Sequence, residues 1–338
     1  MQVQENFSLK RYNTFSIDVL ARSFVAFNTA EQLQEIAGTF SFNPATDLVL
    51  GGGSNLLLTR NVDGMVYKNE ITGIHLVNED ENYKYIQAGA GENWHEFVLF
   101  CIDNNLGGVE NLSLIPGNVG ASPMQNIGAY GVELQDVFSS LDAFHLQEKK
   151  LVRFGLPDCR FGYRNSVFKN IYRNQFMILN VTFRLSKKPV LNTTYSSLEQ
   201  ELAAAGVQDP DIRAVSNAVI RIRRSKLPDP ARIGNAGSFF KNPEVPSWLF
   251  VELKDRFPGI IGFPSAEGKV KLAAGWLIEQ CGWKGYRRGD AGCHAKQALV
   301  LVNHGNASGK EIYELSEDIL ASVKEKFGVE LEREVNII

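Results

Sequence analysis

The chain has 338 residues, 44% hydrophobic and 22% charged, with a formal net charge of -3 at pH 7. This length suits two or three compact domains, and the charge gives no reason to expect nucleic acid or an anionic membrane as partner. No basic region followed by an apolar run opens the chain, and no stretch has the roughly 18 apolar residues of a membrane span. We therefore expect a cytoplasmic protein.

The cysteines are few and follow no framework spacing, so we expect reduced thiols at Cys101, Cys159, Cys281 and Cys293. The neighbouring Cys293 and His294, together with Cys281, suggest a metal site as the alternative. Their spacing fits no common zinc pattern, and we predict no metal.

The first half of the chain alternates between strand-like and helix-like runs. Thr29 and Gln32 form a possible capping box that opens a helix through Ile36. A second helix begins near Asn93 and ends before Gly107. Strands are expected at residues 23–27, 47–50 and 83–88.

Residues 138–185 are β-rich, with the clearest strand at 176–183, and residues 189–224 have helical spacing. The last third has its own apolar residues, which indicates a separate domain. A capping box at Ser308 opens a helix that stops at Gly328. Other predicted elements are helices at 248–257 and 272–281, a buried strand at 298–302 and a final strand at 329–338. The fold class is therefore α+β.

A glycine-rich turn follows the strand at residues 47–50. Consecutive glycines let the backbone approach a ligand and direct several N–H groups at a phosphate. The pattern is neither a P-loop nor a dinucleotide fingerprint. A tight turn between two strands is the equally good alternative for Gly51, Gly52, Gly53, Ser54 and Asn55.

Residues 108–131 are rich in glycine, with Pro, Asn and Gln among them, and cannot form a regular helix or strand. So long a loop is usually functional, and small residues with amide side chains suit the wall of a flavin site. A surface Ω-loop is the alternative.

Two further segments carry candidate side chains. Arg164 lies between aromatic residues, where its planar guanidinium can clamp a carboxylate, although such pairs are also common on surface loops. Ser238 lies in a glycine-rich turn downstream of a basic cluster at residues 222–226. That cluster suits either an anionic ligand or a solvated helix end. No His and acid stand near Ser238 in the sequence, so a hydrolase elbow is not indicated.

Five motifs in one order carry a resemblance to a known family over essentially the whole chain. They are Gly-Gly-Gly-Ser-Asn, Ile-Pro-Gly…Gln-Asn-Ile-Gly-Ala-Tyr-Gly, Tyr-Arg-x-Ser-x-Phe, Lys-Leu-Pro-Asp and Gly-Asn-Ala-Gly-Ser-Phe-Phe-Lys-Asn-Pro. In this order they resemble the UDP-N-acetylenolpyruvoylglucosamine reductases. The resemblance implies a two-lobed FAD-binding domain of the vanillyl-alcohol-oxidase type at residues 1–215, with lobes of about 1–70 and 71–215. A separate α+β domain at residues 216–338 would bind the UDP-sugar, and its last strand would return toward the active site.

The resemblance also assigns residues by motif. Arg164, Ser238 and Glu334 would be catalytic, with Ser238 the proton donor. Tyr195 would belong to the loop of one subgroup, whose tyrosine closes over the diphosphate. Lys226, Asn242 and Gln297 would hold the UDP part. Residues that would contact non-covalent FAD are Gly51, Gly52, Gly53, Ser54, Asn55, Pro116, Gly117, Gly120, Ser122, Gln125, Asn126, Gly128, Ala129 and Tyr130.

The implied reaction is NADPH-dependent reduction of an enolpyruvyl group to a lactyl ether, giving UDP-N-acetylmuramate for peptidoglycan. Its carbanionic centre needs a cation, for which Arg164 and Lys241 are candidates. We expect a monomer whose partners are the UDP-sugar and NADPH. Two rivals are a flavin oxidase of the same FAD fold and a non-catalytic UDP-sugar-binding protein. Retention of Arg164, Ser238 and Glu334 argues against the second rival.

Overall fold

The computed structural model describes residues 2–265 and 268–338, which form two compact units. The first unit comprises Met1–Phe7, Leu20–Gly52 and Val62–Ser225. The second unit comprises Ser8–Val19, Gly53–Asn61 and Lys226–Ile338. The chain therefore passes between the units several times. Two short N-terminal segments belong with the C-terminal residues, and the last passage follows Ser225.

The first unit contains a four-stranded sheet with the order β1-β2-β5-β3, in which β5 pairs in parallel with both β2 and β3. Helix α1 (Ala30–Thr39) covers it and buries Leu33 and Ile36 in the core. Thr29 accepts a hydrogen bond from the backbone N–H of Gln32, which confirms the N-cap. The predicted capping box is incomplete, because the Gln32 side chain accepts from the Asn28 N–H at 2.9 Å. The strands are β1 (Gln4–Ser8), β2 (Leu20–Phe27), β3 (Leu48–Leu50) and β5 (Val62–Asn69).

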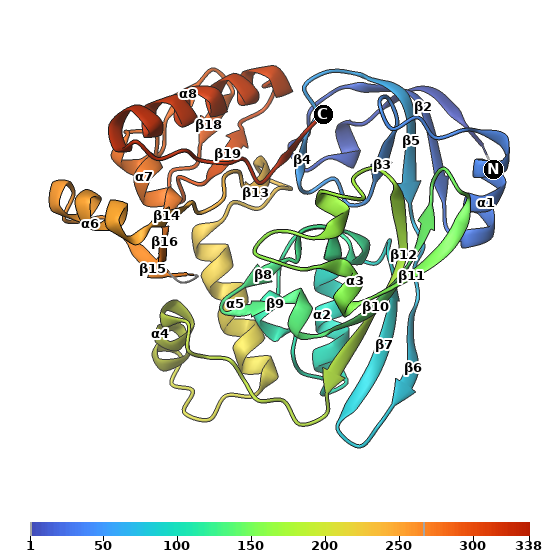
Figure 1. Ribbon diagram of the computed structural model, residues 1–338, viewed down its shortest axis with the longest axis horizontal. Coiled ribbons are helices and arrows are strands. Elements are labelled where there is room, and N and C mark those ends of the chain that lie inside the picture. Colours follow the sequence, from blue (N-terminus) through green and yellow to red (C-terminus); the bar gives the residue numbers. More distant parts are fainter. Residues whose placement is uncertain (1, 266–267) are drawn as a thin grey trace. The chain divides into compact units, whose positions relative to one another are not determined.

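A five-stranded sheet with the order β11-β10-β12-β7-β6 has antiparallel pairing throughout and completes the β structure expected in the middle of the chain (Figure 1). Trp94 and Phe97 of α2 (Trp94–Asp103) pack against Phe183 in its core. Burial of such rings is a large part of the hydrophobic free energy of folding. The strands are β6 (Ile74–Glu79), β7 (Tyr83–Gly89), β10 (Phe138–His145), β11 (Lys150–Gly155) and β12 (Phe176–Ser186).

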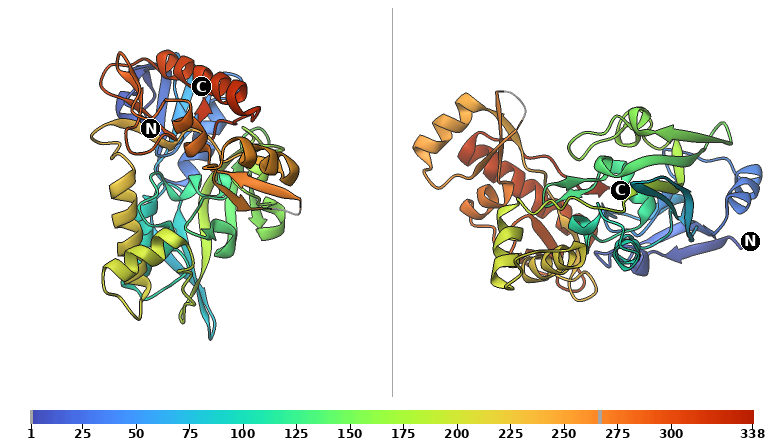
Figure 2. Two further views of the ribbon diagram at one scale, coloured as in Figure 1. Left: turned by 90° about the vertical axis from the view of Figure 1, so that its left-hand side faces the viewer. Right: turned by 90° about the horizontal axis from the view of Figure 1, so that it is seen from below.

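Two helices predicted after residue 189 complete the first unit (Figure 2). Leu198 and Leu202 of α4 (Ser196–Ala204) share a core with Val215 and Val219 of α5 (Ile212–Lys226). Tyr130, at the tip of the β8–β9 hairpin, packs on this core. The short elements between are η2 (Glu110–Leu112), η3 (Val119–Ala121), η4 (Pro123–Gln125), β8 (Gly128–Ala129), β9 (Val132–Glu133), η5 (Leu134–Asp136), α3 (Leu156–Cys159) and η6 (Val167–Lys169).

The second unit contains a four-stranded sheet, β13-β19-β18-β17, and a three-stranded sheet, β14-β16-β15, both antiparallel. Strand β20 pairs in parallel with β4. The strands are β4 (Leu56–Leu57), β13 (Gly234–Ser238), β14 (Glu244–Pro246), β15 (Gly262–Pro264), β16 (Lys269–Leu272), β17 (Arg287–Arg288), β18 (Ala291–Cys293), β19 (Val300–Asn303) and β20 (Asn336–Ile337). The helices are η1 (Lys10–Tyr12), α6 (Ser247–Arg256), α7 (Ala274–Gln280) and α8 (Gly309–Phe327).

Buried polar contacts hold the N-terminal segment in the second unit. The Asn303 amide donates to the carbonyl oxygen of Phe15 at 2.9 Å, and the Asn235 backbone N–H donates to Thr14 at 2.9 Å. A Cβ on Gly234 would lie 2.4 Å from the Phe15 carbonyl oxygen, so only glycine allows this approach. The segment is therefore an integral part of the C-terminal unit.

The final strand is shorter than predicted. Ser308 and Glu311 form the expected capping box of α8, and Gly328 ends the helix with φ 68°. After it, only Asn336–Ile337 (β20) forms a strand, so the prediction over residues 329–338 was wrong in extent. Alternation specifies which side chains share a face but supplies no partner, and β4 offers only two residues for pairing.

Among the described residues, no helix is long and apolar enough to cross a membrane. All four cysteines are free thiols, and no described group of three or more His, Cys, Asp or Glu side chains is arranged to hold a metal ion.

Candidate active site

The glycine-rich turn is divided between the units. The structural reason for a glycine differs from one position of the turn to the next. In the first unit, a Cβ on Gly52 would lie 2.6 Å from Asn118 Oδ1 and 3.0 Å from the Gly117 Cα, so Gly52 is required by packing. A Cβ on Gly51 would meet nothing within 4 Å. Gly51 therefore has an open backbone face, which suits the close approach of a phosphate-bearing cofactor.

The rest of this turn belongs to the second unit. Gly53 has φ 62°, and a Cβ there would lie 2.0 Å from the Tyr12 carbonyl oxygen. Asn55 donates to the Glu334 carbonyl oxygen at 3.3 Å, and its own carbonyl accepts from the Asn336 amide at 2.9 Å. The turn is thus tied to the C-terminal segment that carries a predicted catalytic acid. Ser54 lies within the same turn.

The first part of the long loop is anchored to the end of β7 and the start of α2. Gly120 donates its N–H to the Ala90 carbonyl at 3.0 Å, and Gly117 accepts from the Trp94 N–H at 3.0 Å. A Cβ on Gly120 would lie 2.5 Å from the Ala90 Cβ. The loop is therefore built into the unit rather than lying over its surface, unlike an Ω-loop.

Two polar residues of the loop already have their hydrogen bonds within the protein. Ser122 is 1% exposed, and its hydroxyl donates to the Val119 carbonyl at 2.7 Å. Asn126 is fully buried and donates to Glu133 at 2.8 Å while accepting from the Gln135 N–H at 3.0 Å. Both side chains hold the loop's shape, and their contacts with FAD stay a prediction. Pro116 and Gln125 belong to the same loop. The Gln125 side-chain oxygen accepts a hydrogen bond from Lys169 Nζ at 3.3 Å.

Arg164 lies against the end of the loop. Its Nη2 donates to the Gly128 carbonyl oxygen at 2.7 Å, and its guanidinium carbon is 5.4 Å from the centroid of the Tyr163 ring. Its backbone has φ 53°, a conformation that costs free energy for a non-glycine residue. Arg164 therefore reaches Gly128, a predicted flavin-contacting residue that precedes Ala129, from a strained turn.

Tyr130 links this hairpin to both helices of the α4–α5 pair. Its ring meets the Tyr195 ring edge-on with centroids 5.4 Å apart. Burial raises the pKa of Tyr130, and the bonded guanidinium of Arg223 partly offsets that shift. Burial also lowers the pKa of Arg223, with Tyr130 opposing and Arg164 adding to the effect. Two guanidinium groups and two phenols therefore converge in the first unit.

Leu114, in the first part of the loop, has φ 59°, and both its N–H and its carbonyl oxygen are hydrogen-bonded to side chains. Its N–H donates to His95 Nδ1 at 3.0 Å, and its carbonyl accepts from Arg223 Nε at 3.2 Å. Arg223 and His95 were not predicted as site residues. The signal for Arg223 was its place in the basic cluster, but no pattern in the sequence shows that His95 accepts from Leu114.

In the second unit, Ser238 ends β13 just after Gly237, whose φ of 70° falls at an irregularity in the pairing of β13 with β19. The predicted turn is therefore part of a strand, because the segment pairs with β19 on both sides of this irregularity. The Glu334 N–H donates to the Phe239 carbonyl at 2.8 Å, and the Lys241 N–H donates to the Glu332 carbonyl at 2.8 Å. The two predicted catalytic residues of this unit are therefore on adjacent chain segments. Lys241 Nζ is bound to Glu332 at 2.6 Å, so this lysine already has a carboxylate partner.

Two predicted UDP-binding residues meet at the start of α7. Asn242 Oδ1 accepts from the Ala274 N–H at 3.0 Å, and Gln297 Oε1 would lie 3.0 Å from a Cβ on Gly275. Lys226 is exposed at the end of α5. In the second unit the structure thus pairs the Ser238 and Glu334 segments and places Asn242 and Gln297 at the start of α7.

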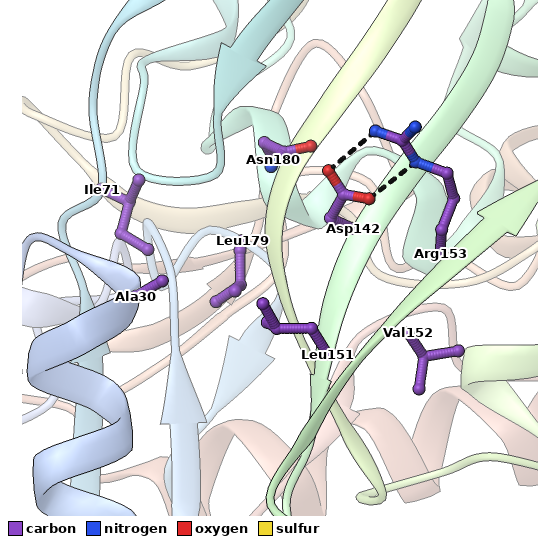
Figure 3. A pocket seen from close by; sticks show the side chains of 8 residues that line it. All are labelled: Ala30, Ile71, Asp142, Leu151, Val152, Arg153, Leu179 and Asn180. Atoms are coloured by element: carbon purple, nitrogen blue, oxygen red, sulfur yellow. Dashed lines mark hydrogen bonds and ion pairs between the residues drawn. The ribbon is translucent and has the colours of Figure 1, made fainter.

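A surface hollow of about 410 Å³ lies elsewhere in the first unit (Figure 3). Asp142 and Arg153, paired across β10 and β11 at 2.8 Å, form its polar side, and Ala30, Ile71 and Leu151 line its apolar side. None of the predicted site residues lines it, so it has no part in the candidate site.

Comparisons with known proteins match both parts of the chain. A model of an FAD binding domain matches residues 21–153, and a model of the UDP-N-acetylenolpyruvoylglucosamine reductase C-terminal domain matches residues 229–338. The open backbone face of Gly51 leaves room for a nucleotide cofactor. The protein is therefore an FAD-dependent oxidoreductase with an FAD-binding domain and a separate C-terminal domain of helices and strands, as predicted.

Full-length relatives define the family. The chain is 47% identical to a UDP-N-acetylenolpyruvoylglucosamine reductase of Flavobacterium johnsoniae, covering 100% of both chains. It is 50% identical to the enzyme of Pseudomonas savastanoi pv. phaseolicola, covering 100% of this chain and 99% of that one. The crystal structure of the Thermus caldophilus enzyme superposes with TM-score 0.70 at 25% identity, covering 100% and 99% of the two chains. The chain belongs to the UDP-N-acetylenolpyruvoylglucosamine reductase family.

Proposed function

We propose that the protein uses NADPH to reduce the enolpyruvyl group of UDP-N-acetylglucosamine enolpyruvate to a lactyl ether. The product is UDP-N-acetylmuramate, a precursor of peptidoglycan. The observation that carries the proposal is the pairing of the Ser238–Phe239 segment with Glu334 inside a chain that matches reductases over its whole length.

We assign FAD binding to the two lobes within residues 1–215 and UDP-sugar binding to residues 216–338. Contacts to FAD are proposed for Gly51 to Asn55 and for the loop from Pro116 to Tyr130. The open face of Gly51 and the anchored backbone of Gly117 and Gly120 support this assignment. When bound, FAD supplies the hydride that adds to the substrate double bond.

Arg164 would stabilise the negative charge that then develops beside the substrate carboxylate. A guanidinium presents a planar pair of donors to a carboxylate and keeps its charge at all relevant pH values. The bond from Arg164 to the Gly128 carbonyl and the contact with Tyr163 support a fixed orientation for the side chain. Fixed donors stabilise developing charge better than donors that must reorient.

Ser238 would donate one proton to the carbanionic carbon. An alcohol is a weak acid, but a carbanion is a strong base, and a nearby cation stabilises the alkoxide that remains. Arg164 is our candidate for that cation, because Lys241 is paired with Glu332. Glu334 would act as a protonated acid or would orient a water or the arginine.

Four residues are proposed to hold the UDP part. Asn242 and Gln297 lie together at the start of α7, which supports a shared ligand. Lys226 offers an exposed cation, and Tyr195 lies 46% exposed at the N-cap of α4, where it is accessible to a diphosphate.

We further propose that the protein works as a monomer in the cytoplasm. Its free thiols suit a reducing compartment, and both proposed substrates are nucleotides.

A coupled assay tests the proposal. The yellow purified protein should oxidise NADPH only when the enolpyruvyl UDP-sugar is present, and the product should gain two hydrogen atoms by mass spectrometry. NADPH oxidation that ignores the UDP-sugar and follows oxygen instead would contradict the proposal and favour a flavin oxidase.

A further inference from the structure

Asn111 lies fully buried in η2, within the first unit and outside the set of residues assigned above. Its side-chain nitrogen donates two hydrogen bonds, one to the Tyr130 carbonyl at 2.9 Å and one to the Asn192 carbonyl at 2.8 Å. Tyr130 is at the tip of the β8–β9 hairpin, and Asn192 is three residues before Tyr195. One amide therefore joins two chain segments that each carry a tyrosine.

Asn192 completes the connection from the other side. Its own amide donates to the Gly131 carbonyl at 2.9 Å, and its side-chain oxygen accepts from Thr194 at 3.0 Å. Gly131 has φ 82°, and a Cβ there would lie 3.0 Å from the Asn192 amide nitrogen. We call the three bonds from Asn111 and Asn192 to Tyr130, Asn192 and Gly131 the asparagine clasp.

The orientation of the Asn111 amide follows from its partners. Two carbonyl oxygens face one end of the amide, so that end must be the nitrogen, since the opposite orientation would set three acceptors together. The Asn111 oxygen is buried and has no hydrogen-bond partner among the described residues. A buried unpaired acceptor is unfavourable, so the donors must be the reason for an asparagine here.

The clasp holds Tyr130 and Tyr195 in contact, with their ring centroids 5.4 Å apart. Tyr195 is 46% exposed at the start of α4, and short polar segments of this kind move readily unless they are tied down. Holding the segment in advance reduces the entropy that a ligand must overcome on binding.

We infer that Asn111 is a positioning residue, which holds the segment of Tyr195 against the Tyr130 hairpin and so prepares Tyr195 for the UDP-sugar. The consequence for substrate rests on the proposed function, whereas the clasp itself does not. Asn111 touches neither substrate nor cofactor in this proposal. It acts through Tyr195.

Hydrogen exchange of the FAD-bound protein tests the clasp without substrate. The backbone N–H groups of Leu198 and Glu199 donate to the Tyr195 carbonyl at 2.8 and 3.1 Å, so their exchange reports on whether the segment of Tyr195 is held. Asn111→Ala and Asn192→Ala should each speed exchange of these two amides about tenfold, because each loses hydrogen bonds of the clasp. Thr193→Ala, in the same segment, is the matched control and should leave the rates unchanged. Equal rates in wild type and both asparagine variants would overturn the inference. Asn192 is at the partly exposed end of the clasp, so its variant decides the question if Asn111→Ala fails to fold.

A double-mutant cycle tests the action through Tyr195. Asn111→Ala should raise KM for the UDP-sugar about tenfold with kcat and KM for NADPH within about twofold. In a Tyr195→Ala background it should raise KM no further, because the residue it positions is absent. An unchanged KM, or the same rise in both backgrounds, would overturn the positioning role. A wild-type protein that shows the exchange pattern but does not turn over the UDP-sugar would contradict the proposed function and leave the clasp supported.

Discussion

The backbone N–H of Glu334 donates to the carbonyl oxygen of Phe239 at 2.8 Å, which places Glu334 beside the residue that follows Ser238. The next bond in this pairing, from the Lys241 N–H to the Glu332 carbonyl, fixes the register. Two candidate catalytic side chains from distant parts of the sequence are thus held by backbone bonds, which substitution of a side chain leaves in place.

This register gives Glu334 a natural control in Glu332, two residues before it. The Glu332 side chain is 72% exposed and pairs with Lys241, and surface ion pairs contribute little to stability. Glu334→Gln should lower kcat about 100-fold or more, because it removes the proposed acid, whereas Glu332→Gln should change kcat less than about twofold. Steady-state kinetics with the enolpyruvyl UDP-sugar measures both. Similar losses in the two variants would remove Glu334 from the mechanism.

The adjacent glycines Gly51 and Gly52 form another matched pair. Gly52→Ala should destabilise the protein by about 1–3 kcal/mol, because its Cβ overlaps Asn118. The methyl group of Gly51→Ala meets no protein atom within 4 Å, so the variant should have the unfolding temperature of wild type. The same methyl group should lower the affinity for FAD. Thermal unfolding of the cofactor-free protein and titration with FAD measure the two effects. Wild-type FAD affinity in Gly51→Ala would show that this backbone face does not contact the cofactor.

His95 should make stability depend on pH. Burial lowers the pKa of His95 from its ordinary value of 6.5, with Arg224 and Arg223 adding to the shift and Glu96 opposing it. The unfolded chain therefore binds the proton more readily, so the contribution of His95 is complete above about pH 6.5 and is lost as pH falls through the folded pKa. Protonation would also remove the acceptor for the Leu114 N–H.

Urea unfolding at about pH 7.5 and about pH 5.5 measures this dependence. His95→Gln should flatten the loss of stability between the two values, and His75→Gln, on an exposed strand, should keep it. A His95→Gln profile that matches wild type would show that other groups cause the dependence.

Local signals in the sequence predicted local structure well. The capping box at Ser308 and Glu311 forms as expected, whereas at Thr29 only the N-cap bond forms and the Gln32 side chain accepts from the Asn28 N–H. The family resemblance identified the FAD-dependent oxidoreductase, but it assigned residues by motif and gave no contacts.

The features that the sequence did not predict depend on contacts between residues far apart in the chain. The bond from Asn303 to Phe15 spans most of the chain, and no periodicity indicates that residues 8–19 join the C-terminal unit. Likewise, no pattern in the sequence shows that Gly120 packs against Ala90, whose Cβ would lie 2.5 Å from a Cβ at position 120. The contact of Gly120 with FAD stays a prediction. Asn111 lay inside a predicted loop, and its two donated bonds depend on residues that follow it in other elements.

The central claim is that Ser238 delivers one proton to the substrate carbon after hydride transfer. Rapid-mixing absorbance of the FAD-bound Ser238→Ala variant tests this directly, because the two half-reactions are recorded separately. If Ser238 is the donor, NADPH should reduce the flavin of the variant at the wild-type rate, and the enolpyruvyl UDP-sugar should reoxidise it at least about 100-fold more slowly. Wild-type rates in both half-reactions would contradict the claim.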